Sequence, residues 1–468
     1  MKFRFLILFF VCHISSGFSQ KSTYSYLELD SETTSLEVLL QKYIQIPSVS
    51  GEEKEAGEFL KTVCKENGLI ITDFGTENGN YNFAASLQPL ELGKPNIVFL
   101  NHIDVVMEGE SSKYGPYSGK IENGHVYGRG AIDNKGAAVM QLGAVLQAHK
   151  LMNKAESNYN VTFLSVSCEE NQCKGGANFV VQNYLDLLNP VVVIGEGPSE
   201  LSSILGGEFN HDVFGISLAH KRTLWLNLKL NIETAGHASI TPHHYANKDM
   251  VKALDNLISK KQKIIFNDIN VEFLKSLGEH KKGIEKLVLS HPKFFKPFLS
   301  KQIRAHPELA AIYSNTLTLT NVYSDNKTYN KIPNSIEAYL DCRLLPETDE
   351  VEFIKDIKKR LKNDSISVNI TEQTARTFPS GKQNIYYQNL KKAIKLNYAG
   401  AEVISLIMPN LNDLGVFREK GIPCYATIPV YFSRDEVETI HNVDENISIK
   451  SLYQGTQVYY DFIELMLE

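Results

Sequence analysis

The stretch "NIVFLNHIDVV" at residues 96–106 decides the fold of this chain, because a nearly continuous apolar run ends there in a histidine and an aspartate. Runs of this kind are typical of strands buried on both faces of a parallel sheet. Two similar runs follow, "YNVTFLSVSCEEN" (159–171) and "NPVVVIGEGP" (189–198). A helical pattern at 135–153 separates the first two runs. The sequence therefore predicts an α/β fold with a mainly parallel sheet and flanking helices.

The character of the sequence changes after about residue 215. Alternating apolar and polar residues in 223–234, 316–323 and 335–345 indicate half-exposed antiparallel strands. Helical patterns accompany them, helices are also expected in the charged stretch 262–312, and α/β character returns from about residue 380. We therefore predict an α+β domain inserted into a discontinuous α/β domain. The predicted boundaries are 20–219 and 374–468 for the α/β domain and 220–373 for the inserted domain.

The first twenty residues, "MKFRFLILFFVCHISSGFSQ", have the features of a secretory signal peptide. Lys2 and Arg4 precede a short apolar run, and small residues precede an expected cleavage site near Ser19 and Gln20. A buried core helix is the alternative, but the run has no polar face. We predict a signal peptide over 1–19 and a mature protein that is secreted or periplasmic. No other apolar segment approaches a membrane-spanning length, so no membrane span is expected.

The composition is that of an ordinary globular protein, with 43% hydrophobic and 22% charged residues. The formal net charge is −6, and removal of Lys2 and Arg4 with the signal peptide would change it to −8. Because no long basic run is present, a nucleic-acid partner is not expected. A negatively charged protein is compatible with bound divalent cations and a small-molecule substrate.

The cysteines are too few and too scattered for a disulfide scaffold, and no CxxC zinc motif is present. A bridge between Cys168 and Cys173 is one alternative, and buried free thiols are the favoured interpretation. The five cysteines of the expected mature chain are Cys64, Cys168, Cys173, Cys342 and Cys424.

Residues able to bind metal follow the end of each predicted parallel strand. The carboxyl ends of such strands share one edge of the sheet, so these side chains are expected to meet there. Crowded carboxylates repel one another, and a pair of divalent cations removes that repulsion. Taken singly, each residue has an ordinary explanation, such as a helix N-cap for Asp133 or a solvated helix start for the adjacent glutamates. The set comprises His102, Asp104, Asp133, Glu169, Glu170 and Glu196.

Histidine and carboxylate ligands without thiolates favour zinc, with cobalt or manganese as substitutes. Asp104 lies two residues after His102, so it can accept the imidazole N–H and orient the ring. One of the adjacent glutamates can bind metal while the other acts as general base. The stretch "GRGAIDNKG" (128–136) lacks the ending of a phosphate-binding loop. Its glycines instead favour a tight turn that would let Asp133 bridge two ions.

The chain resembles the dizinc exopeptidase family that includes aminoacylase, carboxypeptidase G, succinyl-diaminopimelate desuccinylase and carboxypeptidase S. The resemblance is strongest to the carboxypeptidase S branch and its secreted animal relatives that handle N-fatty-acyl amino acids. It covers nearly the whole expected mature chain in the family's order. The matching stretches are "IPSVSGEE" (46–53), "NHIDVV" (101–106), "YGRGAIDNKG" (127–136), "CEEN" (168–171), "GEGP" (195–198), "AGHAS" (235–239), "LDCRLLP" (340–346), "REKGIPCY" (418–425) and "IHNVDENI" (440–447).

The resemblance implies a role for each matching residue. It implies a general base at Glu169, an orienting carboxylate at Asp104 and a non-prolyl cis peptide between Asp133 and Asn134. One metal would be held by His102, Asp133 and Glu196, and the other by Asp133, Glu170 and His441. His441 follows from the resemblance alone, because it is one of thirteen histidines and no spacing distinguishes it.

The resemblance also implies substrate-binding residues in the inserted domain, which would serve as a lid or a dimerisation element. His237 would stabilise the developing oxyanion, often from the neighbouring subunit of a homodimer. Arg343 would bind a free substrate carboxylate, and Asn315 would assist. A polar loop histidine and a surface ion pair are the ordinary alternatives for His237 and Arg343. One departure is "NLND" (410–413), where many members carry Gly-Thr-Asp, so the floor of the substrate pocket is not predicted.

We therefore predict a secreted, zinc-dependent hydrolase that cleaves the amide bond of an N-acyl amino acid or short peptide with a free carboxylate. The expected mechanism uses a water that bridges two metal ions, activated by Glu169. A dipeptidase of the same family is the alternative within enzymes. A non-catalytic binding protein that keeps the fold is the alternative outside them.

Overall fold

The computed structural model describes residues 25–467, except for 76–79, 108, 110–112, 152–156, 203–210, 234–235, 280, 325 and 327. The predicted signal peptide at 1–19 lies outside the described residues. Within them, no helix is long and apolar enough to cross a membrane.

An eight-stranded sheet forms the centre of the larger body of the molecule, in the order β15-β10-β16-β9-β5-β8-β4-β3. The central strand β5 pairs in parallel with both β8 and β9, as the sequence predicts. Antiparallel pairs join β16 to β10, β8 to β4 and β4 to β3. The strands are β3 (Ile70–Asp73), β4 (Phe83–Ser86), β5 (Asn96–His102), β8 (Asn160–Val166), β9 (Pro190–Gly195), β10 (Val213–His220), β15 (Glu402–Met408) and β16 (Cys424–Ala426).

Helices cover both faces of this sheet, which explains why its central strands are apolar at nearly every position. On one face, Ile97 and Phe99 of β5 pack into a core with α1, α2, α3, α12 and α15. On the other, Val98 and Leu100 pack with α4 and α13. The predicted α/β fold class is therefore confirmed. The helices are α1 (Leu36–Ile44), α2 (Lys54–Glu66), α3 (Lys135–Leu151), α4 (Ala177–Leu188), α12 (Ile385–Asn397), α13 (Leu414–Glu419) and α15 (Ile449–Leu467).

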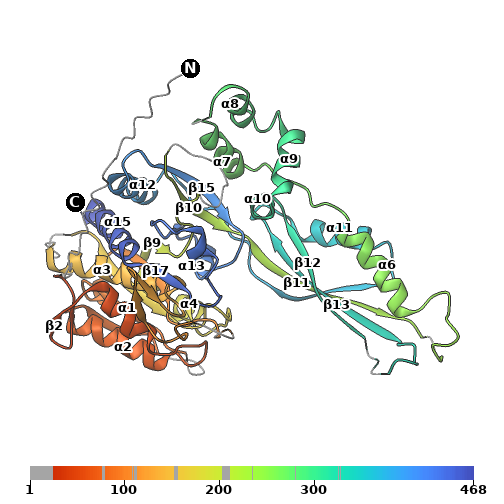
Figure 1. Ribbon diagram of the computed structural model, residues 1–468, viewed down its shortest axis with the longest axis horizontal. Helices are drawn as coiled ribbons and strands as arrows, with labels where there is room; N and C mark the ends of the chain where they lie inside the picture. The colour runs from red at the N-terminus through yellow and green to blue at the C-terminus, as the bar shows by residue number, and fades with distance from the viewer. Residues whose placement is uncertain are drawn as a thin grey trace, which may run out of the picture.

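A separate four-stranded antiparallel sheet projects from this body, in the order β12-β13-β11-β14 (Figure 1). Its strand β11 follows β10 after the single residue Lys221. Alternate residues of β13 are buried, as the sequence pattern predicts, because α6 and α11 cover one face of the sheet. The elements are β11 (Arg222–Asn231), α6 (Ala246–Ile258), β12 (Thr316–Ser324), β13 (Ser335–Leu344), α11 (Glu350–Leu361) and β14 (Ser367–Gln373).

The helices expected within 262–312 are present, and they pack against the larger sheet. Phe273 and Leu299 from this segment share a core with Val213 of β10 and Leu406 of β15. The segment thus joins the larger body, although it lies between strands of the smaller sheet in sequence. The domain boundaries at 220 and 373 remain a prediction. The four helices are α7 (Asp268–Glu279), α8 (Gly283–Ser290), α9 (Lys296–Ala305) and α10 (Pro307–Tyr313).

Short elements complete the described fold. A three-stranded sheet in the order β17-β7-β6 places residues 446–448 beside residues 125–127. It thereby joins the chain just after His441 to the chain just before Asp133. The remaining elements are β1 (Glu28–Leu29), β2 (Glu32–Thr33), a 3-10 helix (Leu90–Leu92), β6 (Lys120–Glu122), β7 (His125–Tyr127), α14 (Arg434–Val437) and β17 (Asn446–Ser448).

Candidate metal centre and active site

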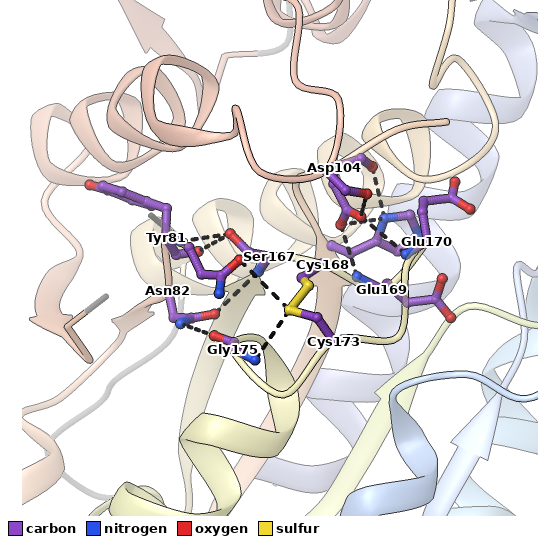
Figure 2. Close-up of a disulfide and its surroundings, with 12 residues drawn as sticks. Tyr81, Asn82, Asp104, Ser167, Cys168, Glu169, Glu170, Cys173 and Gly175 are labelled. Atoms are coloured by element: carbon purple, nitrogen blue, oxygen red, sulfur yellow. Dashed lines mark hydrogen bonds and ion pairs between the residues drawn. A yellow bond between two sulfur atoms is a disulfide. The ribbon is translucent and has the colours of Figure 1, made fainter. Parts of the chain in front are cut away.

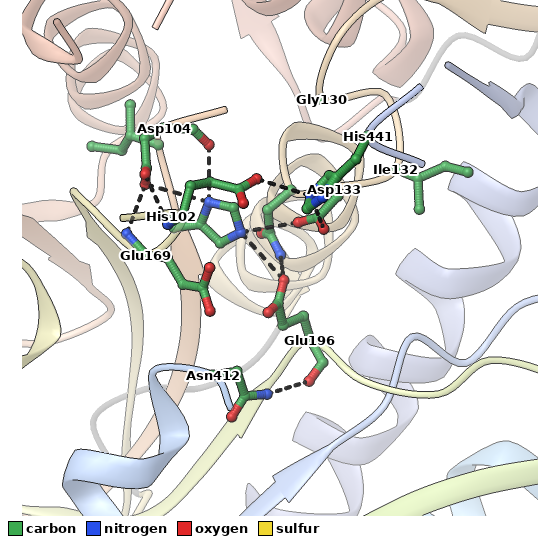
Figure 3. A network of polar contacts seen from close by, with 12 residues as sticks. His102, Asp104, Gly130, Ile132, Asp133, Glu169, Glu196, Asn412 and His441 are labelled. Carbon is green, nitrogen blue, oxygen red and sulfur yellow. Dashed lines mark hydrogen bonds and ion pairs between the residues drawn. The ribbon is translucent and has the colours of Figure 1, made fainter. Parts of the chain in front are cut away.

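The carboxyl ends of β5, β8 and β9 deliver the predicted site residues to one edge of the larger sheet (Figure 3). His102 is the last residue of β5, and Glu196 directly follows β9. Glu169 and Glu170 lie three and four residues beyond the end of β8. Asp133 comes from the turn before α3. The parallel arrangement inferred from the apolar runs thus brings these side chains together.

Asp133 lies between two histidines. Its Oδ1 atom is 3.0 Å from Nε2 of His102, and its Oδ2 atom is 3.2 Å from Nε2 of His441. The same nitrogen of His102 lies 3.3 Å from Oε2 of Glu196, and that of His441 lies 3.2 Å from Oε1 of Glu170. The five predicted metal ligands therefore form one connected cluster. Each oxygen of Asp133 faces a separate pair made of one histidine and one further carboxylate.

The donor set of this cluster fits divalent metal. His102, Asp133 and Glu170 offer ligand atoms that all lie within 4.8 Å of one another, and so do His102, Glu169 and Glu196. These trios differ from the two predicted ligand sets, and the second trio adds Glu169, the predicted general base, to the cluster. Nitrogen and oxygen donors without thiolates suit zinc, cobalt or manganese.

Electrostatics also favours a cation at this place. Burial, followed by the neighbouring Glu196, holds the pKa of Glu169 well above its usual value. Burial and then Asp133 raise the pKa of Glu196. Burial likewise raises the pKa of Asp413, beside the same acids, to about 8. These carboxylates destabilise one another's ionised forms, and a bound cation would stabilise those ionised forms.

The two histidines respond to the same acids in the opposite direction. Hydrogen bonds to Asp133 and Glu170 raise the pKa of His441 to about 10. Burial alone would lower the pKa of His102, but hydrogen bonds to three carboxylates hold it well above its usual value. The carboxylates therefore favour positive charge in the two spaces that they share with Nε2 of His102 and Nε2 of His441.

Asp104 contacts both His102 and the loop that carries the two glutamates. Nδ1 of His102 lies 2.9 Å from the backbone oxygen of Asp104 and 3.4 Å from its Oδ1. The Asp104 carboxylate accepts hydrogen bonds from the backbone N–H groups of Glu169 and Glu170, at 3.1 and 3.0 Å. It also accepts one from the Ser50 hydroxyl at 2.7 Å. Asp104 is therefore placed to orient the imidazole and the glutamate loop together, and the sequence pattern did not predict the contact with the loop.

A disulfide between Cys168 and Cys173 encloses that glutamate loop (Figure 2). The favoured interpretation of free thiols is therefore wrong for this pair. Left-handed backbone at Cys168 and Gln172, with φ of 73° and 50°, turns the loop back so that the two cysteine Cα atoms lie 5.6 Å apart. Cys64, Cys342 and Cys424 are buried and free, as expected.

Glu445 is a buried residue whose contribution sequence reasoning did not identify. Its Oε1 atom accepts hydrogen bonds from the backbone N–H groups of Ile132 and Asp133, at 2.9 and 3.0 Å. Its Oε2 atom accepts from the Gly130 N–H at 3.0 Å and from the Arg129 guanidinium at 2.9 Å. Glu445 thus joins the turn of Asp133 to the loop of His441. Its position within the matching stretch "IHNVDENI" is the feature of the sequence that could have indicated a role for it.

Two asparagines extend the cluster around Glu196. Asn134 donates from Nδ2 to Oε2 of Glu196 at 2.6 Å, and the peptide bond between Asp133 and Asn134 is cis, as the resemblance implies. Asn412 donates to the backbone oxygen of Glu196 at 3.2 Å (Figure 3). Sequence reasoning did not assign a role to either side chain.

The three predicted substrate-binding residues lie outside the cluster. Two Arg343 nitrogens bind the Asp341 carboxylate, at 2.8 and 3.1 Å, and a third binds the Thr223 hydroxyl. The Asn315 carbonyl oxygen accepts from the Leu345 N–H and the Thr348 hydroxyl.

His237 is exposed and contacts Ser239 in a loop beyond the end of β11. Among the described contacts of these three residues, none reaches the metal cluster, so their roles remain predictions.

A parallel sheet that gathers histidines and carboxylates at one edge, with an antiparallel sheet inserted beside it, defines a two-part metallohydrolase. The chain belongs to peptidase family M20/M25/M40, whose sequence pattern matches residues 98–465. It is accordingly a metallohydrolase that acts on amide bonds, and the resemblance noted from the sequence is confirmed.

Individual relatives agree with this assignment. An uncharacterized metallohydrolase of Methanocaldococcus jannaschii is 25% identical, over 89% of this chain and 95% of its own length. The N-fatty-acyl-amino acid synthase/hydrolase of Homo sapiens is 22% identical, over 92% of this chain and 88% of its own. The crystal structure of an M20 family metallo-carboxypeptidase from Sulfolobus solfataricus has the same fold, with a TM-score of 0.65, 21% identity and coverage of 92% and 98%.

Proposed function

We propose that this chain is a secreted, zinc-dependent amidohydrolase. Its substrate would be an N-acyl amino acid or a short peptide that ends in a free carboxylate. The observation that carries the proposal is the position of Asp133, whose two oxygens face two separate histidine–carboxylate pairs. That arrangement is what a carboxylate shared by two ions requires.

Two metal ions would occupy this cluster. His102, Asp133 and Glu196 would hold one, and Asp133, Glu170 and His441 would hold the other. When bound, such a pair would polarise an amide carbonyl and lower the pKa of a water molecule at the site toward neutrality. The short, buried contacts around Asp104 and Glu445 would keep the ligands in position for both ions.

Glu169 is the proposed general base. It would accept a proton from the attacking water and then donate that proton to the leaving amine. Its high pKa, caused by burial and by Glu196, suits a group that must hold the proton between these steps. The hydrogen bond from its backbone N–H to Asp104 and the disulfide of Cys168 restrict the movement of its loop.

The inserted sheet would supply substrate contacts. Arg343 would bind the free carboxylate of the substrate, which would compete with Asp341 for the guanidinium. His237 would stabilise the developing oxyanion from the partner subunit of a homodimer. Movement of the inserted sheet would exclude water from the reacting groups.

Secretion is proposed from the signal-peptide pattern at 1–19. The disulfide between Cys168 and Cys173 supports it, because such bonds persist in oxidising compartments.

The test is a hydrolysis assay on a panel of N-acyl amino acids and dipeptides, together with measurement of bound metal. We expect bound zinc, loss of hydrolysis with EDTA, and recovery after zinc or cobalt is restored. A protein that binds no zinc and gains no activity from either metal would instead be a binding protein that has kept the fold. Hydrolysis of dipeptides alone would favour the dipeptidase alternative.

A further inference from the structure

We propose that helices α8 and α9 form a surface that binds an anionic lipid bilayer. This α8–α9 surface comprises residues 281–304, which include both helices and the turn between them. Helices α7 and α10 contact strand β15, whereas α8 packs on α7 and α9 packs on α10. The α8–α9 surface is therefore the outer layer of this segment, and it stands out from the larger body (Figure 1). The inference does not depend on the proposed catalytic function.

The α8–α9 surface is strongly basic in a protein that is acidic overall. It contains seven basic residues and one acid, Glu285, so its formal charge is +6. The whole chain carries −6, which leaves −12 on the remaining residues. Such an uneven distribution of charge is typical of a protein that contacts an anionic surface. The basic residues are Lys281, Lys282, Lys286, Lys293, Lys296, Lys301 and Arg304.

Acids of the neighbouring helices do not cancel this positive charge. The whole of α7 to α10, residues 268–313, adds four acids and one lysine to the surface and still carries +3. Two of those acids already have partners, because Asp268 lies 3.4 Å from Lys293 and Glu272 pairs with Lys382. The excess of positive charge therefore belongs to the protruding segment as a whole.

Large apolar side chains are exposed on the same surface. Ile284 and Phe294 are each 80% exposed, and Leu287 and Phe298 are more than half exposed. Ile284 and Leu287 lie three positions apart on α8, so they share one side of that helix. Exposed apolar side chains interspersed with lysines are typical of protein surfaces that lie in a membrane interface. There the apolar groups enter the headgroup layer while the cations contact lipid phosphates.

This combination favours a bilayer over two other partners. A second copy of the α8–α9 surface would place +6 against +6, so charge opposes self-association through this face. A nucleic acid would attract the lysines, but the aliphatic side chains of Ile284 and Leu287 cannot stack on its bases. An anionic bilayer uses both features. It would also repel the acidic remainder of the protein, which would orient the α8–α9 surface toward the lipid.

The first test measures binding of the mature protein, beginning at Gln20, to lipid vesicles by co-sedimentation. Vesicles of phosphatidylcholine that contain phosphatidylglycerol are compared with vesicles of phosphatidylcholine alone, at low and at high salt. We expect binding at least about tenfold tighter to the anionic vesicles. High salt should weaken that binding, because it screens exposed charges. No binding to the anionic vesicles, or equal binding to both kinds, would overturn the proposal.

A matched pair of triple variants locates the electrostatic contact. One variant, K282Q/K286Q/K301Q, removes three exposed lysines of the α8–α9 surface. The control, K355Q/K358Q/K359Q, removes three exposed lysines of α11 and changes the net charge by the same amount. Each lysine near an anionic bilayer contributes about fivefold to affinity, so the first variant should bind at least about thirtyfold more weakly. Equal affinities of the two variants would contradict the assignment.

A second pair tests the apolar contact and distinguishes lipid from other polyanions. Ile284→Ser combined with Phe294→Ser should weaken binding to the anionic vesicles by at least about tenfold. Ile240→Ser combined with Phe378→Ser exchanges the same residue types at 80% and 76% exposure, outside the surface, and should bind like the wild type. Thermal unfolding checks that every variant is folded. Wild-type affinity in the first pair would show that the surface recognises negative charge alone, and the bilayer would be the wrong partner.

Discussion

Asp133 connects the two halves of the candidate metal centre, because its two oxygens face different histidines. Neither histidine lies near it in sequence. Burial alone would raise the pKa of the Asp133 carboxyl, but the hydrogen bonds from His102 and His441 lower it below the usual range. Asp133 therefore remains ionised, as a shared metal ligand must.

Glu169→Ala tests the proposed general base. We expect the variant to keep its bound zinc, because the five proposed ligands are unchanged, and to lose about 10²- to 10⁴-fold in kcat. Metal content by mass spectrometry and steady-state kinetics are the two measurements. Near-normal hydrolysis by a zinc-loaded variant would exclude Glu169 as the base.

Strand-end residues were predictable from sequence because their positions follow directly from the parallel sheet. His102 and Glu196 are examples, since each stands at or next to a strand end. His441 follows α14 in a loop with left-handed backbone (φ 58°), so no periodic pattern indicates it. Asn412 and Asp413 were equally hidden, since their positions depend on contacts between segments more than 200 residues apart.

Two loops that are distant in sequence are held together by one buried carboxylate. Glu445 accepts from three backbone N–H groups of the turn that carries Asp133, and it pairs with Arg129. Pairing of β17 with β7 adds main-chain hydrogen bonds at the same place. The separation between Asp133 and His441 therefore depends on Glu445.

Glu445→Gln is expected to weaken both the fold and the metal site. It leaves the buried Arg129 without its counter-charge, which should lower the free energy of unfolding by about 3 kcal/mol. Zinc affinity, measured by competition with a chelator, should fall as well. Glu438→Gln removes an exposed ion pair with Arg434 and is the matched control, with a loss of at most about 1 kcal/mol. Unchanged zinc affinity in Glu445→Gln would show that Glu445 does not position the ligands.

Lys221, between β10 and β11, predicts a dependence of stability on pH. It is fully buried, and its ammonium donates to the Ala311 carbonyl and the Thr316 hydroxyl. Burial, followed by the nearby Arg343, lowers its pKa from 10.5 to about 7. Between these two pH values the unfolded chain binds a proton that the folded chain lacks. The free energy of unfolding therefore gains a positive slope with pH, of up to about 1.4 kcal/mol per pH unit.

Lys221→Met should remove that slope. The measurement is chemical denaturation at pH 7, 8 and 9, with the wild type gaining stability relative to the variant as the pH rises. Lys420→Met, at an exposed position, is the matched control. Parallel curves for the wild type and Lys221→Met would contradict the lowered pKa.

The junction at Lys221, between β10 and β11, explains why one strand was not predicted from the sequence. The apolar runs predicted β5, β8 and β9, and the alternating pattern predicted β11 and β13. Strand β10 was not predicted, because one residue separates it from β11 and no turn signal marks the boundary. β3 and β4 were missed too, since both are only four residues long.

At the scale of the whole molecule, β11 and the rest of the inserted sheet project away from the larger body (Figure 1). β11 begins two residues after His220, which lines a cavity of about 280 Å³ together with Glu169. Its ten residues then extend over about 33 Å before the loop of His237. The proposed role of His237 therefore predicts that His237 of one subunit acts in the site of a second subunit.

Mixing two inactive variants tests this arrangement. His237→Ala and Glu169→Ala proteins, unfolded and refolded together, should recover about a quarter of wild-type activity if dimers form at random and sites are shared. Each variant refolded alone is the control. No recovery, with mixed dimers demonstrated by mass spectrometry, would place His237 outside the partner's site.

The order of the proposed ligands along the chain affects when the protein can acquire its metal. Four of them precede residue 197, whereas His441, β15 and β16 come from the last seventy residues. During synthesis, four of the five proposed ligands therefore leave the ribosome long before His441 does. If His441 holds the second ion, that ion can be bound only after the C-terminal region has folded, and we expect the metal supply of the compartment where folding ends to decide which ion fills the second position.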